Sequence, residues 1–408
     1  MIAALRRCLS ALLLAGLLQG CASDLASPFS AVVVAYDAAP GTVSTAREAR
    51  YKLAQVRITT LTSLRRLEGT SATVLVGGSA RVDPTLYGKP GANLPGLRAL
   101  LLTDPPTAVD LSFNVLNEGL VYPENYTSLE LLTAYANLER ARAAFTRWGA
   151  QLQLAPVYAH TPLTNDRGLS PLADGELYYP PLGAFFLPAP STKAQLPLHF
   201  NLGAVSHGLA LQAWQQLVWA SAPVDPAATA PATDPDALSS RHIGASMAQG
   251  VADFLGSAVS RDPRWFDHSL QQQADSRSLD QRRCGDAAMA QALDEDDART
   301  PYNPYPLGTV LAFALWEQLP SPPDDNLLAE SARGVLAALP GIGAAQSANG
   351  GKLALAAALN ALVAQAPVDL KANLCNSFRN RFAALAIPSN GLSSCAGVAY
   401  VAPAEPCL

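Results

Sequence analysis

Hydrophobic residues dominate nearly every face of one predicted helix in the middle of the chain. From Leu198 to Val218 they recur at spacings of three and four, with Leu209 and Trp214 among them. This spacing predicts an α-helix, and a helix that is apolar all round belongs in a protein core. His207 lies in the middle of the stretch. We therefore expect one buried imidazole in largely hydrophobic surroundings.

The N-terminal part of the chain shows a pattern typical of strands. Residues 31–36, 55–60 and 71–76 are runs rich in β-branched and other apolar residues, and residues 109–115 alternate between apolar and polar. Glycine and proline pairs between the runs favour turns. The pattern predicts a small β-rich domain over residues 31–125.

A helical periodicity follows. Leu131, Tyr135, Leu138 and Phe145 form one apolar stripe, and Glu139 lies elsewhere on the wheel. A loop rich in proline, alanine, threonine and aspartate separates the central apolar helix from further helices. This order predicts an α+β fold that ends in a helical lobe. The remaining expected strands lie at 152–158, 175–180 and 183–187, the loop at 221–240, and the helices at 242–260, 305–316, 325–338, 352–366 and 370–386.

Residues 1–20 have the features of a bacterial secretory signal. Arg6 and Arg7 precede an apolar run that is too short to span a bilayer as a helix. The following Leu18-Gln19-Gly20-Cys21 resembles the lipobox of bacterial lipoproteins. The resemblance implies cleavage before Cys21, lipidation of its thiol and new amino group, and a tether over residues 21–30. An ordinary secretory signal with an incidental cysteine is the alternative.

Charge and the lipobox together limit the expected partners. Ala22 follows Cys21, whereas an aspartate there would retain a lipoprotein in the inner membrane, so the resemblance implies the bacterial outer membrane. The chain of 408 residues has a formal charge of −5 and no basic stripe. We therefore expect contact with the membrane through the lipid at Cys21, and no nucleic-acid partner.

Four cysteines remain after signal removal and lipidation, and they lie in an oxidising compartment. Their spacing does not match a zinc site such as Cys-x-x-Cys, so disulfides are favoured. Four cysteines allow three pairings, and the sequence leaves all three open. The one we favour joins Cys375 to Cys395 across a short loop, and joins Cys407 in the tail at 388–408 to Cys284.

Three motifs follow one another in a characteristic order. Tyr135-Ala136-Asn137-Leu138-Glu139-Arg140-Ala141 lies on a predicted helix, Asp174-Gly175-Glu176-Leu177-Tyr178 precedes an edge strand, and the apolar helix with His207 comes next. The order resembles the catalytic domain of the gluzincin metallopeptidases, the thermolysin- and fungalysin-like group. The resemblance implies a gluzincin-like two-lobe domain over residues 126–387, in which a small mixed sheet with helices precedes the helical lobe.

The zinc-binding positions of that family are largely replaced here. The family places H-E-x-x-H on the apolar helix, for two ligands and the base, and a glutamate ligand on the next helix, in E-G-x-A-D for example. This chain has His207-Gly208-Leu209-Ala210-Leu211 and Gln249-Gly250-Val251-Ala252-Asp253, and no glutamate between Leu177 and Asp294. The sequence therefore predicts vestigial metal-site positions, with neither metal nor cofactor bound: His207, Leu211, Gln249 and Asp253.

Zinc hydrolysis requires three protein ligands and a base, so we expect no catalysis. His207 is expected to be a hydrogen-bonded core histidine with Asp253 as its partner. The expected function is that of a lipid-anchored cell-envelope protein with an inactive zinc-peptidase-like fold and a binding or structural role. A peptide or an envelope protein is the expected occupant of the former cleft. The alternative is a metallopeptidase with a non-standard site of His207, His242 and Asp253.

Overall fold

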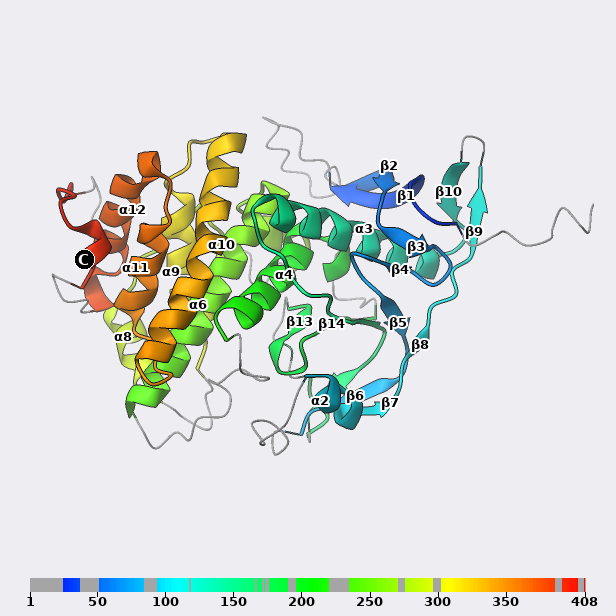
Figure 1. Cartoon of the computed structure of the whole chain (residues 1–408), viewed down its shortest axis with the longest axis horizontal. Coiled ribbons are helices and arrows are strands. Elements are labelled where there is room, and N and C mark those ends of the chain that lie inside the picture. Colours follow the sequence, from blue (N-terminus) through cyan, green and yellow to red (C-terminus); the bar gives the residue numbers. More distant parts are fainter. Residues whose placement is uncertain are drawn as a thin grey trace, which may run out of the picture.

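The computed structural model shows a mixed α+β fold, with strands gathered at one end of the molecule and helices at the other (Figure 1). The expected signal at 1–20, Cys21 and the first residues of the tether lie outside the described residues. No helix of the described part is long and apolar enough to cross a membrane. The structure describes residues 25–36, 51–83, 94–116, 119–165, 167–170, 172, 176–189, 196–219, 235–270, 276–295, 302–385, 391–402 and 407.

Two adjacent helices fill the centre of the molecule, and a third packs against the second of them (Figure 1). They are largely buried, and the first is the apolar helix that the sequence predicts. Asn201 caps this first helix by accepting hydrogen bonds from the backbone N–H groups of Gly203 and Ala204. The three helices are α4 (Leu202–Leu217), α6 (Pro235–Ser260) and α9 (Tyr305–Trp316).

Two glycines allow α6 and α9 to approach closely. A Cβ atom on Gly250 would lie 2.5 Å from the carbonyl oxygen of Gly308, which is too short for a nonbonded contact. A Cβ atom on Gly308 would lie 2.9 Å from the carbonyl oxygen of Ser246. The backbones of the two helices therefore touch directly, and a larger residue at either position would push them apart.

The first sheet packs against helix α3 (Tyr126–Arg147), mainly through strand β1. Its strand order is β2-β1-β10-β9, and β1 runs parallel to β10 and antiparallel to β2. Phe29, Ala31 and Val33 alternate along β1 and are buried, as expected for a strand with one face on the core. The strands are β1 (Phe29–Tyr36), β2 (Tyr51–Ile58), β9 (Phe113–Val115) and β10 (Leu120–Pro123).

The second sheet joins chain segments from both sides of residue 125. Its order is β13-β14-β11-β5-β8, and the central strand β11 lies parallel to both β14 and β5. The boundary that we placed at residue 125 therefore falls inside a shared sheet, because a three-residue strand such as β5 cannot bury its apolar side chains alone. The strands are β5 (Val74–Val76), β8 (Thr107–Ala108), β11 (Val157–Ala159), β13 (Tyr178–Tyr179) and β14 (Ala184–Leu187).

Two smaller sheets complete this end of the molecule. One has the order β12-β6-β7, and it also crosses residue 125, while the other pairs β3 with β4. A short helix, α2, lies beside β7. The elements are β3 (Leu61–Ser63), β4 (Glu68–Gly69), β6 (Ser79–Arg81), α2 (Leu94–Leu101), β7 (Leu102–Asp104) and β12 (Leu163–Thr164).

Glu139 fastens α3 to the turn that follows β2. The helical periodicity places this residue away from the apolar stripe, yet it is buried. Its carboxylate accepts hydrogen bonds from the backbone N–H of Thr59, at 2.8 Å, and from the hydroxyl of Thr60, at 2.7 Å. The hydroxyl of Tyr135 lies 2.8 Å from that of Thr60. One continuous hydrophobic core, from Phe29 to Cys395, therefore includes the N-terminal strands and the helices.

The C-terminal part of the chain is helical, as predicted, and two disulfides fix its end. Cys375 is bonded to Cys395, and Cys284 to Cys407, which is the pairing that we favoured from the sequence. Pro340 lies inside the longest helix of this part without ending it. The helices are α8 (Ala287–Leu293), α10 (Asp325–Ala348), α11 (Leu355–Ala364) and α12 (Val368–Arg381).

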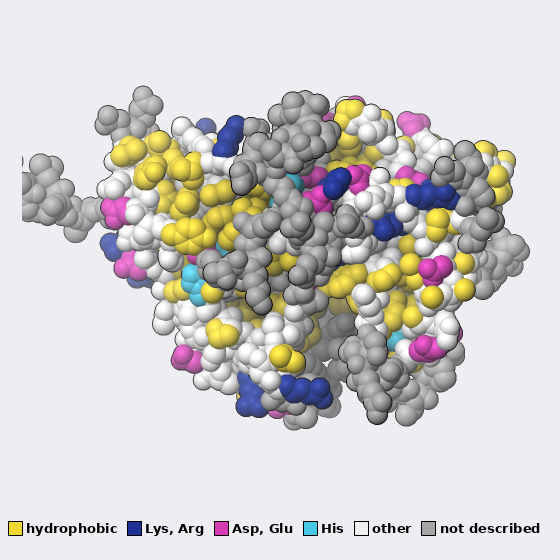
Figure 2. All heavy atoms as spheres, turned by 180° about the vertical axis from the view of Figure 1, so that it is seen from behind, with side chains coloured by type: hydrophobic (Ala, Val, Ile, Leu, Met, Phe, Trp, Pro, Cys, Tyr) yellow, Lys and Arg dark blue, Asp and Glu magenta, His cyan; other side chains and the backbone are white. Residues whose placement is uncertain are grey.

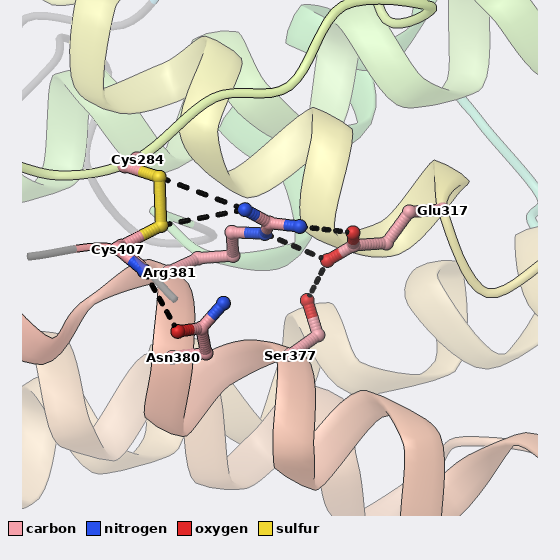
Figure 3. The surroundings of a disulfide bond; sticks show 6 residues. All are labelled: Cys284, Glu317, Ser377, Asn380, Arg381 and Cys407. Atoms are coloured by element: carbon pink, nitrogen blue, oxygen red, sulfur yellow. Dashed lines mark hydrogen bonds and ion pairs between the residues drawn. A yellow bond between two sulfur atoms is a disulfide. The ribbon is translucent and has the colours of Figure 1, made fainter. Parts of the chain in front are cut away.

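An ion pair lies beside the disulfide between Cys284 and Cys407 (Figure 3). The Arg381 guanidinium donates to both carboxylate oxygens of Glu317, at 3.0 Å and 2.6 Å, and one of its nitrogens lies 3.3 Å from the Cys407 sulfur. The Ser377 hydroxyl donates to the same carboxylate. The two-point arginine–carboxylate contact thus holds α12 against the residue that follows α9, next to the bonded tail.

Apolar side chains are exposed on the strand-rich end of the molecule. Figure 2 shows hydrophobic side chains gathered over the part that the N-terminal strands form. Leu53 of β2, Val115 of β9 and Tyr122 of β10 are exposed large hydrophobic residues. The first sheet therefore presents apolar groups at its surface as well as toward α3.

Candidate functional site

Helices α4 and α6 bring three of the four predicted vestigial positions into one buried cluster. The Nε2 atom of His207 lies 3.0 Å from Oε1 of Gln249 and 3.3 Å from Oδ1 of Asp253. His207 and Asp253 have no exposed surface, and Gln249 is buried. The fourth position, Leu211, lies one turn after His207 and belongs to the hydrophobic core. His207 is thus a core histidine beside Asp253, as expected.

A guanidinium group completes this cluster, and the sequence analysis missed it. Arg277 is 1 % exposed. Its Nη2 lies 2.5 Å from Oδ1 of Asp253 and 3.1 Å from Nε2 of His207, and its Nε lies 3.3 Å from Oδ2 of Asp253. An arginine keeps its positive charge at any physiological pH, so Asp253 has a permanent counter-ion in the core.

Two aromatic rings enclose the Arg277 guanidinium. Its central carbon lies 4.0 Å from the ring centroid of Phe266 and 4.1 Å from that of Tyr305. A cation over an aromatic face is stabilised by the ring quadrupole, most strongly where water is excluded. The group is therefore fixed on its flat faces by the rings and along its edge by the Asp253 carboxylate.

A carboxylate from the edge-strand segment orients the amide of Gln249. Oε1 of Glu176 accepts a hydrogen bond from Nε2 of Gln249, at 2.6 Å, and another from the Tyr305 hydroxyl, at 3.1 Å. Because an ionised carboxylate only accepts, the Gln249 amide must turn its own oxygen toward His207. The same nitrogen of His207 thus meets an acceptor, the Gln249 amide oxygen, and a donor, the Arg277 guanidinium. Burial, and next the charge of Glu176, raises the pKa of Tyr305.

The position of the motif glutamate has no room for a side chain. Gly208 stands where H-E-x-x-H has its catalytic base. A Cβ atom on Gly208 would lie 2.8 Å from the Phe185 ring of β14. A glutamate there would have to displace a fully packed aromatic ring. The sheet therefore occupies the space that a base on α4 would need.

The non-standard zinc site is not assembled. His207 and Asp253 meet, but His242 bonds elsewhere: its Nδ1 lies 2.9 Å from the Leu293 carbonyl oxygen, and its ring stacks on Tyr302 at 3.9 Å. Across the described ranges, no group of three histidine, cysteine, aspartate or glutamate side chains is arranged to hold a metal ion. The positive charge in this cluster is that of Arg277.

The cluster forms one wall of an open pocket of about 790 Å³. Glu176, Arg277 and Tyr305 belong to both. Most of the remaining wall comes from the start of α9, from the residues just before it and from the segment before α8. Those lining residues are Ser276, Arg282, Arg283, Cys284, Met289, Tyr302, Asn303, Pro304, Pro306, Thr309 and Val310. Although α4 and α6 pack directly on each other, a concave surface thus remains beside this cluster.

A second buried ionisable cluster lies at the beginning of α3. Nε2 of His199 lies 2.9 Å from Oε1 of Glu130, an ion-pair contact without hydrogen-bond alignment, and Nε2 of His160 lies 3.1 Å from the same oxygen. Burial raises the pKa of Glu130, but the contacts with the two histidines outweigh it, so the pKa lies below its ordinary value. Nothing in the sequence pattern linked these three residues, which are brought together by folding.

The lowered pKa of Glu130 predicts how stability depends on pH. A carboxylate with a depressed pKa in the folded state stabilises the protein above its unfolded-state pKa, and this stability is lost as the pH falls through the folded-state value. We therefore expect Glu130→Gln to reduce the free energy of unfolding at pH 7. The difference in free energy of unfolding between the variant and the wild type should become smaller below about pH 4.5. Urea unfolding at several pH values measures it, and a gap that widens on acidification would contradict the assignment.

Comparison with protein families, with curated proteins and with solved structures finds no match to this chain.

Proposed function

We propose that the chain is a non-catalytic binding protein, lipid-anchored in the bacterial outer membrane, with a gluzincin-like two-lobe arrangement from which the metal has been lost. The support for the anchor is the lipobox-like sequence that ends at Cys21. The support for the ancestry is the order of the motifs together with the packing of α4 against α6, which brings His207 to Gln249 and Asp253.

The main support for a loss of catalysis is the position of the Arg277 guanidinium. It lies next to His207, the histidine that matches a zinc ligand of the family, and it pairs with Asp253, the carboxylate of the cluster that contacts His207. A divalent cation at this point would meet a fixed positive charge at short range in a buried site, where solvent screens charge repulsion little. Arg277 thus supplies the charge balance that the metal would supply in a peptidase.

Catalysis also lacks a base. A zinc-bound water needs a nearby group that accepts its proton. Gly208 has no side chain, and Glu176 already accepts from Gln249 and Tyr305 while it is held away from His207 by Gln249. A binding role therefore fits the site better than a hydrolytic one, and the open pocket offers the surface for it.

Metal analysis of the purified mature chain tests this proposal. After incubation with zinc and dialysis, we expect no stoichiometric zinc in the wild type, and no change in metal content in His207→Ala. The physical reason is that two of the three ligand positions are Leu211 and Gln249, which do not replace histidine and carboxylate on zinc.

One tightly held zinc per chain, removed by a chelator and lost in His207→Ala, would instead support the metallopeptidase with a non-standard site. Peptide hydrolysis that disappears with the metal would support it further. A His160→Ala variant is the matched control, because that histidine contacts Glu130 and belongs neither to this cluster nor to the non-standard site.

A further inference from the structure

The charged side chains that line the pocket beside the cluster already have partners in the folded chain. Arg277 pairs with Asp253, and Glu176 accepts hydrogen bonds from two neutral donors. Arg282 and Arg283, which also line the pocket, have interactions of their own. A charged ligand would have to compete with these contacts and would also lose its own hydration. The pocket therefore favours an uncharged ligand.

Much of the remaining wall is apolar and aromatic. Met289 and Val310 contribute to it, together with the rings of Tyr302 and Tyr305. The Tyr302 ring stacks on that of His242 at a centroid distance of 3.9 Å, so the protein itself holds it in position. Preformed walls of this kind bind the hydrophobic body of a ligand, and the volume of about 790 Å³ is that of a small-molecule site.

The wall also contains a buried hydroxyl that lacks a partner in the folded chain. Thr309 lines the pocket and is 1 % exposed, and its hydroxyl makes no hydrogen bond to the described residues. It lies one turn after Tyr305 on α9, so the two side chains share a face of that helix. A buried hydroxyl without a partner is unfavourable, and a ligand atom that bonds to it removes this cost. Thr309 therefore marks the position for one polar group of a ligand.

We propose that this pocket binds a small uncharged molecule with an apolar or aromatic body and a hydrogen-bonding group, such as an alcohol, that pairs with Thr309. The body lies against Tyr302, Met289 and Val310. The inference rests on the proposed binding role and names the class of ligand that the pocket takes. It requires no metal and no chemical step.

Equilibrium dialysis of the purified mature chain, with its disulfides intact, tests the class of ligand. The probes are 3-phenylpropan-1-ol and two ions with the same aromatic body, 3-phenylpropanoate and 3-phenylpropylammonium. We expect saturable binding of the alcohol and weaker binding of both ions, because an ion loses more hydration when it enters the pocket. No binding of the alcohol at millimolar concentration, or tighter binding of either ion, would overturn the proposal.

Thr309→Val tests where the polar group of the ligand lies. Valine keeps the shape of the side chain and removes the hydroxyl. The affinity for 3-phenylpropan-1-ol relative to that for propylbenzene, which has no hydroxyl, should therefore fall by about fivefold. Thr146→Val on the exposed surface of α3 is the matched control and should leave this ratio unchanged. A ratio that is the same in Thr309→Val as in the wild type, or that falls equally in the control, would contradict the proposal.

Thermal unfolding of the same variant tests whether the hydroxyl lacks a partner in the unbound protein. Removal of an unpaired buried hydroxyl also removes its desolvation cost, so the melting temperature of Thr309→Val should not lie below that of the wild type. A clear decrease would show that the hydroxyl is already hydrogen-bonded within the protein, and the proposal would fail. Zinc content measured on the same samples tests the non-catalytic role separately, since an uncharged ligand can bind whether or not zinc is held.

Discussion

Replacing Arg277 with methionine is expected to lower the free energy of unfolding by about 3–5 kcal/mol, the effect of breaking a buried ion pair from one side. Methionine follows the arginine side chain as far as Nε, so the change removes the charged group between the rings of Phe266 and Tyr305 and keeps the packing of the aliphatic stem. Asp253, which has no exposed surface, would then stay in the core without its counter-ion. Urea unfolding followed by circular dichroism measures the loss.

A surface pair provides the control for this experiment. Arg264 also contacts an aspartate, Asp267, at 2.7 Å, but its side chain is 47 % exposed. Solvent screens such a pair, so Arg264→Met should reduce stability by no more than about 1 kcal/mol. If Arg277→Met is no more destabilising than Arg264→Met, the guanidinium does not balance a buried charge.

The double variant Arg277→Met/Asp253→Asn separates charge from shape. Because it removes both charges together, it should be more stable than Arg277→Met alone. Zinc content of the stable double variant is also informative, since the fixed positive charge is gone from beside His207. We expect it to remain metal-free, because Leu211 and Gln249 still occupy the ligand positions.

Loss of the disulfide between Cys284 and Cys407 is expected to be the second large effect, about 5 kcal/mol. The bond closes a loop of 123 residues, and the stabilisation from restricting the unfolded chain grows with loop length. Replacing both cysteines with serine should therefore lower the melting temperature clearly. Thermal unfolding by calorimetry, with and without a reductant, measures the change.

The other disulfide is the internal comparison. Cys375 and Cys395 are separated by 20 residues, so replacing this pair should cost about 3 kcal/mol, less than the longer loop. The prediction fails if the order is reversed.

The local elements of this protein are readable from the sequence because they depend on periodicity. The apolar stretch around His207 predicts α4, and the segments at 242–260 and 305–316 correspond to α6 and α9. The favoured cysteine pairing also agrees with the structure. The helices involve residues close in sequence, and four cysteines allow only three pairings. Each prediction therefore had few alternatives.

The sheet organisation is not readable in the same way. β5 has three residues and pairs with a strand more than eighty positions later, and no local pattern names that partner. Glu139 lies off the apolar stripe of α3 and still becomes buried, because Thr59 and Thr60 meet it from the N-terminal segment. The domain boundary that we placed at residue 125, where the local pattern changes, therefore divides a sheet and a core to which both parts of the chain contribute.

The sequence by itself determined which residues stand at the positions that the gluzincin resemblance assigns to a base and two ligands: Gly208, Leu211 and Gln249. Only the tertiary structure decided which groups lie beside them. Arg277 lies 24 residues after Asp253 and 70 after His207, in a segment without a recognisable motif, and Glu176 comes from the strand side. A buried charge is compensated by whichever group folding brings within a few ångströms of it. The separation of two residues along the chain does not predict that distance.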